Sequence, residues 1–145
     1  MTDFLDAGQL LAIRQAFAFV WVIVFAGAFL AFANRLSSID LQAKFPSEDF
    51  VAFPGRRQCH AAMTFCAGNI LVYAWGWLYL FMQSTGGEMT IVNRLYLVAI
   101  SGHVIAIAGC IWCVRAFLPE SLPTIHWILI AALALTGLVT VNLAL

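Results

Sequence analysis

The stretch QAFAFVWVIVFAGAFLAFA, residues 15–33, contains no charged residue and no proline. A helix needs about 20 predominantly apolar residues to cross the hydrocarbon core of a bilayer, so this stretch predicts a membrane-spanning helix. Further apolar runs of similar length cover residues 61–82, 91–114 and 125–145. A membrane barrel would instead show segments of about 10 residues with alternating hydrophobicity. The sequence therefore predicts an all-α, integral membrane four-helix bundle, with residues 1–145 forming a single transmembrane domain.

The composition agrees with a membrane environment. The chain is 63% hydrophobic and 10% charged, and its mean hydropathy is +0.95. Soluble domains average roughly 45–50% apolar and about 25% charged residues. Lipid is therefore a predicted partner, because a chain of this length cannot hide so much apolar surface. The net charge of zero and the scattered basic residues argue against nucleic acid as a partner.

The distribution of basic residues predicts the orientation. The long connection between the first two helices, residues 34–60, carries Arg35, Lys44, Arg56 and Arg57, and Arg115 borders the same side. Arg14 and Arg94 belong to the opposite side. Cytoplasmic loops of membrane proteins are enriched in Lys and Arg. We therefore expect a cytoplasmic 34–60 connection and two non-cytoplasmic termini.

The third apolar run contains SGHVIAIAGCIWCVR, residues 101–115, with one histidine and a C-x-x-C pair. At about 100° per residue, its small residues gather beside the histidine, opposite a large aliphatic face. Small residues let membrane helices approach closely. We predict a packing seam that meets the second helix through a hydrogen bond between Asn69 and His103. Its predicted members are Asn69, Gly102, His103, Ala106, Gly109, Cys110 and Cys113.

The same residues have chemical alternatives. Cys110 and Cys113 have the spacing of a redox dithiol, although the predicted orientation places them on the reducing side. A metal site could combine Cys59, His60, Cys110 and Cys113, but a second close-spaced pair is missing, so we predict no metal. Haem ligation by His103 would need a second histidine at equal depth, and His60 and His126 begin their helices instead. We predict no cofactor.

Three segments carry a resemblance to a known family. They are AKFPSEDFVAF at 43–53, RRQCH at 56–60 and NRLYLVAISGHVIAIAG at 93–109. With the four-helix layout they resemble the MAPEG superfamily, the membrane glutathione transferases and eicosanoid-pathway proteins. The resemblance implies a homotrimer that binds glutathione. The implied anion site comprises Arg56, Arg57, His60, Arg94, Arg115 and His126. In the family, polar residues follow the segment that corresponds to RRQCH. In this chain, AAMTFC, residues 61–66, takes their place.

The scarcity of polar groups in the apolar runs favours a non-catalytic role. We expect a structural or accessory subunit of a homo-oligomer or of a larger membrane complex, in contact with other membrane chains. A MAPEG-like glutathione transferase is the alternative from the enzyme class. A phage-type pore-forming protein is a further alternative, but such proteins rarely need so long a connection as residues 34–60.

Overall fold

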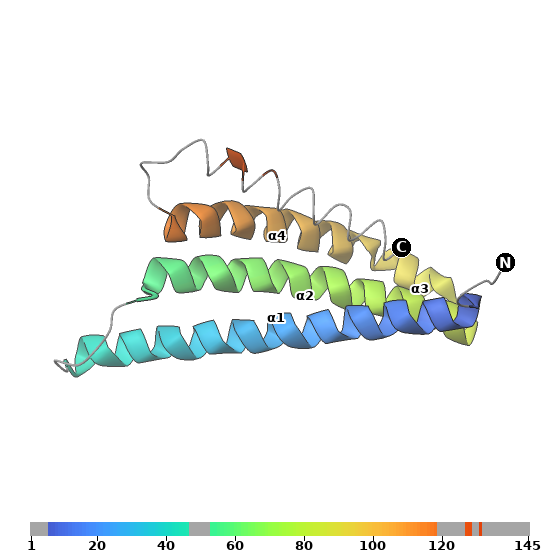
Figure 1. Cartoon of the computed structure of the whole chain (residues 1–145), viewed down its shortest axis with the longest axis horizontal. Coiled ribbons are helices and arrows are strands. Elements are labelled where there is room, and N and C mark those ends of the chain that lie inside the picture. The colour runs from blue at the N-terminus through green and yellow to red at the C-terminus, as the bar shows by residue number, and fades with distance from the viewer. Residues whose placement is uncertain (1–5, 47–52, 119–126, 129–130, 132–145) are drawn as a thin grey trace.

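The computed structural model describes residues 6–46, 53–118, 127, 128 and 131. Its elements, in chain order, are α1 (Ala7–Lys44), α2 (Arg56–Thr85), α3 (Met89–Arg94) and α4 (Tyr96–Phe117) (Figure 1). All the elements formed by the described residues are helices. Three segments, Ala7–Lys44, Arg56–Thr85 and Met89–Phe117, are long and apolar enough to cross a membrane. The all-helical prediction is thus confirmed for the described residues, with three segments that could span a membrane, whereas most of the predicted helix at 125–145 lies outside the described residues.

Helix α1 begins earlier than the hydropathy predicted. Asp6 caps it through a reciprocal pair of contacts: its carboxylate accepts from the backbone N–H of Gln9 at 2.7 Å, and the Gln9 side-chain oxygen lies 3.3 Å from the Asp6 nitrogen. Such a capping box satisfies N–H groups that the first helical turn leaves without partners. The helix therefore starts at Ala7 rather than near residue 15.

The other end of α1 corrects the predicted connection at 34–60. The helix continues to Lys44, and its first helix-breaking residue is Pro46, which disfavours helical backbone at the preceding residue. Residues 56–60 are already part of α2, so the connection shrinks to residues 45–55. At 1.5 Å per residue, α1 is about 57 Å long, well beyond the roughly 30 Å hydrocarbon core. Its last turns therefore extend past the start of α2 (Figure 1).

Helices α1 and α2 run antiparallel and meet through aromatic rings. Trp21 and Phe25 of α1 stack on Tyr73 of α2, with ring centroids 6.1 and 5.8 Å apart. Phe65 adds an edge-to-face contact to Phe25 at 5.9 Å. Offset and edge-to-face pairs are favourable ring geometries beyond their buried area. Tyr73 is therefore part of the contact between the two helices.

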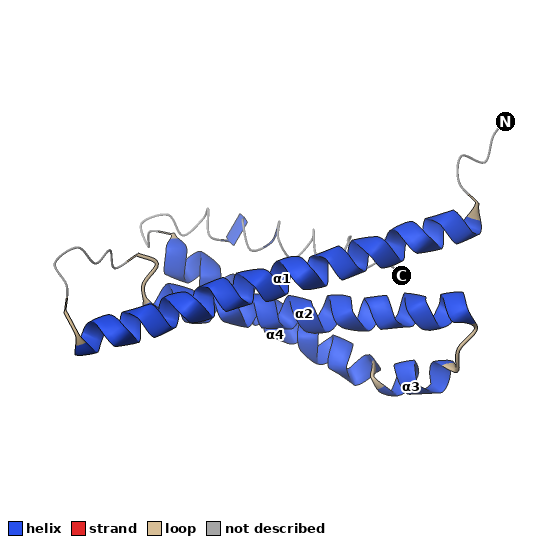
Figure 2. Ribbon diagram, turned by 90° about the horizontal axis from the view of Figure 1, so that it is seen from below, coloured by secondary structure: helices blue, strands red, loops and turns tan. Residues whose placement is uncertain are grey.

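Helices α2 and α4 meet through glycines instead. A methyl carbon added to Gly68 would lie 2.3 Å from the backbone nitrogen of Ala106, and one on Gly109 would lie 2.4 Å from that of Phe65. A methyl carbon on Gly102 would lie 2.9 Å from Cβ of Leu71. The two backbones approach this closely because no side chains separate them there. Helix α2 thus lies between α1 and α4, with an aromatic contact on one side and a glycine contact on the other (Figures 1 and 2).

The helix predicted at 91–114 is divided. Gly86, in the left-handed region with φ of 66°, ends α2. Helices α3 and α4 meet at Leu95, which has right-handed backbone angles but interrupts the regular helix. The indole nitrogen of Trp75 donates to the Val92 carbonyl at 3.1 Å. In a continuous helix, that carbonyl would accept from Tyr96 N–H instead. A side chain from a neighbouring helix that hydrogen-bonds to a backbone carbonyl is a recognised cause of such interruptions.

Candidate functional site

The polar side chains inside the spans bond mainly to their own helices. Asn69 Nδ2 donates to the Phe65 carbonyl at 2.9 Å, and His103 Nδ1 lies 2.7 Å from the Ala99 carbonyl. The predicted hydrogen bond between Asn69 and His103 is therefore wrong for the part of the chain that the structure describes. The physical reason is local: a carbonyl four residues earlier is always within reach of a helical side chain, whereas a partner on another helix has to be positioned by packing.

His103 nevertheless has one ring nitrogen in a hydrogen bond of defined direction. A carbonyl oxygen can only accept a hydrogen bond, so Nδ1 carries the proton in this contact. In the neutral ring the second nitrogen, Nε2, then presents a lone pair. Within the described residues, the structure gives Nε2 no hydrogen-bond partner. The contact thus orients the imidazole, and in the neutral ring it leaves Nε2 as an acceptor atom for a further molecule.

A cavity of about 290 Å³ lies beside this histidine. Helix α1 contributes Ala18, while most of the wall comes from α2 and α4. The largest lining side chains are aromatic: Tyr73, Trp75 and Tyr96. Trp75 and Tyr96 also contact each other, with ring centroids 5.5 Å apart. Residue patterning alone did not predict this site.

The cysteines do not assemble a metal site in the described ranges. No group of three or more His, Cys, Asp or Glu side chains there could hold an ion. Cys59 is fully buried in the first turn of α2, with its thiol 3.8 Å from the Pro54 carbonyl, whereas His60 beside it is exposed. All four cysteines are free thiols, and Cys110 is buried on the seam side of α4.

The basic residues of the implied glutathione site divide between two ends of the molecule. The Gln58 amide donates to the Ala116 carbonyl at 3.0 Å, so the start of α2 lies beside the end of α4. This contact brings the end with Arg56, Arg57 and His60 near Arg115. Arg94 lies in α3, near the level of Trp75, which is about 28 Å along α2 from Arg56. His126 lies outside the described residues.

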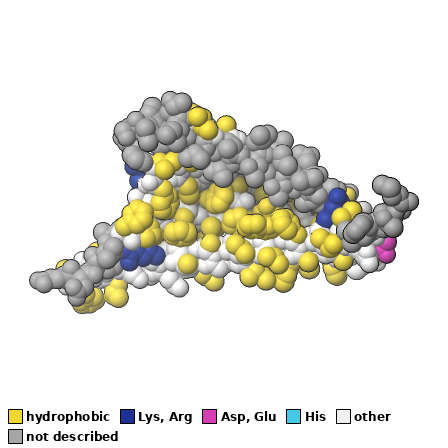
Figure 3. All heavy atoms as spheres, viewed as in Figure 1, with side chains coloured by type: hydrophobic (Ala, Val, Ile, Leu, Met, Phe, Trp, Pro, Cys, Tyr) yellow, Lys and Arg dark blue, Asp and Glu magenta, His cyan; other side chains and the backbone are white. Residues whose placement is uncertain are grey.

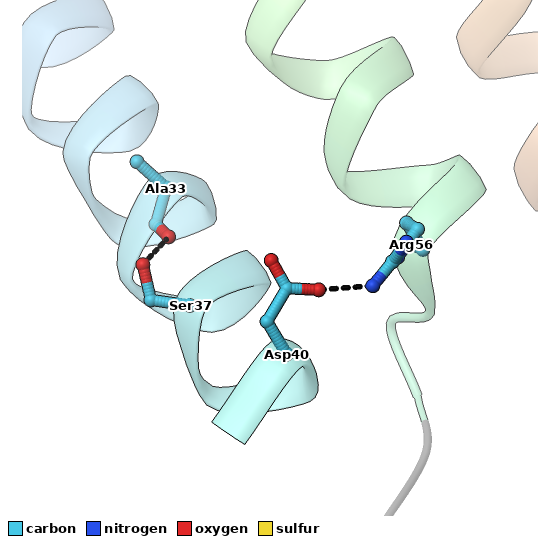
Figure 4. Close-up of polar contacts among 4 residues, drawn as sticks. All are labelled: Ala33, Ser37, Asp40 and Arg56. Atoms are coloured by element: carbon cyan, nitrogen blue, oxygen red, sulfur yellow. Dashed lines mark hydrogen bonds and ion pairs between the residues drawn. The ribbon is translucent and has the colours of Figure 1, made fainter. Parts of the chain in front are cut away.

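Sequence reasoning also missed a polar corner where α1 overhangs α2. Asp40 of α1 pairs with Arg56 at the start of α2 (Figure 4). Arg35 donates to the carbonyls of Phe53 and Pro54 at 3.2 and 3.4 Å. These contacts join residues that are not neighbours in the sequence, so no local sequence pattern predicts them. The corner contains two of the basic residues of this end, Arg35 and Arg56, and Lys and Arg side chains gather at both ends of the visible face (Figure 3).

Comparison of the chain with models of protein families, with characterised proteins and with solved structures gives no match in any of the three. The resemblance to the MAPEG superfamily therefore stays a prediction. The candidate sites are consequently argued from their own geometry.

Proposed function

We propose that this chain is a polytopic membrane protein that acts as a non-catalytic structural or accessory subunit, packed against copies of itself or against other chains of a membrane complex. The observation that carries the proposal is the outward face of α1. Among the 38 residues of this helix, Ala18 is the buried one. Small residues recur on the exposed side as two pairs four apart, Ala12 with Ala16 and Gly27 with Ala31.

These four positions fall within about 100° of one another on the helix. A methyl carbon at Gly27 would meet no atom within 4 Å, so the chain itself leaves this face open. Small residues spaced by four let the backbone of a second membrane helix approach closely. The face therefore suits a packed helix from another chain.

The polar side chains inside the spans support a non-catalytic role. Thr64, Asn69 and Ser101 each donate to the carbonyl four residues earlier, at 2.9 Å in every case. A catalytic group needs to reach a substrate and a partner group rather than its own backbone. These three side chains are already occupied by their own helices.

The mass of the purified particle tests the proposal. The protein is extracted from its native membrane in a mild detergent, and the protein mass is measured by light scattering. We expect a particle larger than the 15.9 kDa chain, and we expect Gly27→Leu to reduce that mass by filling the outward face. Gly76→Leu is the matched control, because that glycine also has open space around its Cα but lies on α2. A wild-type monomer, or a Gly27→Leu particle of unchanged mass, would contradict the proposal.

A second candidate is the glutathione transferase that the MAPEG resemblance implies. It is favoured by the shared location of Arg56, Arg57, His60 and Arg115 at one end, because clustered cations stabilise a thiolate. Arg94, at the opposite end, has no place in such a site. Conjugation of glutathione to a chromogenic electrophile tests this candidate: turnover that Arg57→Ala abolishes would support it, and turnover at the uncatalysed rate would reject it.

A further inference from the structure

The cavity beside His103 has the features of a binding site for a small molecule. Its volume of about 290 Å³ is close to the lower limit of ligand pockets, roughly 300 Å³. Its walls are predominantly apolar, and it lies between three segments that are long and apolar enough to span a membrane. A ligand would therefore enter from the lipid and would itself be uncharged, because burying a charge there is costly.

Two features of the lining define the shape of that ligand. The rings of Tyr73, Trp75 and Tyr96 form an aromatic wall, and aromatic rings pack favourably on other flat rings. Gly76 lies in the same wall, and a methyl carbon added to it would meet no atom within 4 Å. Space therefore exists directly above the α2 backbone, beside Trp75. A planar ring fits this opening better than a branched aliphatic group.

His103 defines the polar chemistry of that ligand. In the neutral ring, the contact of its Nδ1 with the Ala99 carbonyl at 2.7 Å leaves Nε2 as a hydrogen-bond acceptor. A ligand donor can hydrogen-bond to this nitrogen. A ligand acceptor in the same place would leave two lone pairs facing each other. The ligand must thus present an O–H or N–H group at the edge of its ring.

We propose that this cavity binds the ring of a lipid-soluble phenol or hydroquinone, with the ring against Trp75 and Tyr96 and a hydroxyl group donating to Nε2 of His103. The corresponding quinone has carbonyl oxygens where the hydroquinone has hydroxyl groups, so it cannot make this hydrogen bond. At His103, the site therefore favours the reduced ring over the oxidised one. This inference does not depend on the oligomeric role proposed for α1, because most of the cavity lining comes from α2 and α4.

Fluorescence quenching of the full-length protein in lipid nanodiscs tests the proposal, because Trp75 forms part of the wall. The probes are decylubiquinol, kept reduced under anaerobic conditions, and decylubiquinone. We expect saturable quenching by the quinol, with a Kd about tenfold lower than that of the quinone, which is the usual effect of one hydrogen bond. His103→Phe should raise the Kd for the quinol to that of the quinone.

Two glycine variants separate specific binding from partition into the lipid. Gly76→Leu should remove the saturable component by filling the cavity, and Gly27→Leu, on the outward face of α1, should leave it unchanged. Circular dichroism of each variant establishes that it has retained its helices. Equal affinity for quinol and quinone would overturn the proposal, as would wild-type quenching that remains in Gly76→Leu. Loss of oligomers in Gly27→Leu with intact quinol binding would support both proposals separately.

Discussion

Replacement of Gly68 by alanine tests the contact that joins α2 to α4. The added carbon would lie 2.3 Å from the Ala106 nitrogen and 2.7 Å from the Gly102 carbonyl oxygen. Non-bonded carbon atoms are comfortable at about 3.5 Å or more. Both obstacles are backbone atoms, which cannot rotate away as a side chain can. The two helices would therefore have to separate by about 1 Å.

The energetic cost follows from this displacement. Overpacking in a well-packed interior typically costs 1–3 kcal/mol. Because Gly102 and Gly109 share the same close contact, separation at Gly68 also loosens the packing around them, so we expect a loss of about 3 kcal/mol. That corresponds to roughly a hundredfold change in the unfolding equilibrium. Native proteins have a total stability of about 5–15 kcal/mol, so the variant should still fold.

The matched control is Gly76→Ala in the same helix. Its new carbon meets no atom within 4 Å, so it should be neutral or more stable by up to about 1 kcal/mol, from the greater helix propensity of alanine. Both variants are unfolded with a denaturing detergent in mixed micelles, and helicity is followed by circular dichroism. Unfolding curves of Gly68→Ala and Gly76→Ala that coincide would refute the argument from backbone contact.

Three further predictions concern other contacts. Trp75→Phe removes the hydrogen bond to the Val92 carbonyl; we expect a loss of up to about 1 kcal/mol and slower amide exchange at Tyr96, whose N–H can then donate to the Val92 carbonyl, and unchanged exchange would contradict this. Asp40→Asn breaks the ion pair with Arg56, whose side chains are 51–60% exposed. Stability should therefore fall by less than about 1 kcal/mol, and the difference from wild type should vanish in high salt. A larger loss that does not depend on salt would contradict this prediction. Asp6→Ala removes the cap of α1 and should cost about 1 kcal/mol, with faster amide exchange in the first turn as its measure.

The sequence alone determined the membrane-spanning helical character of the protein. Apolar stretches such as residues 15–33 leave the backbone no water to bond with, and a helix satisfies every N–H and C=O group within the stretch itself. The spacing of Gly102 and Gly109 indicated a close helix contact for the same local reason. Helix ends were predicted less well: hydropathy reports where lipid is tolerated, whereas the cap at Asp6 and the break at Pro46 decide where α1 begins and ends.

The tertiary structure decided what depends on distant residues. The break at Leu95 accompanies the donation from Trp75 to Val92, and no pattern within residues 89–117 contains that tryptophan. The cavity requires Tyr73, Tyr96 and His103 to converge from two helices, and the division of the basic residues between two ends follows from the antiparallel return of the chain. Local sequence specifies hydrogen bonds within a helix, but the neighbour of each helical face is chosen by packing across the whole molecule.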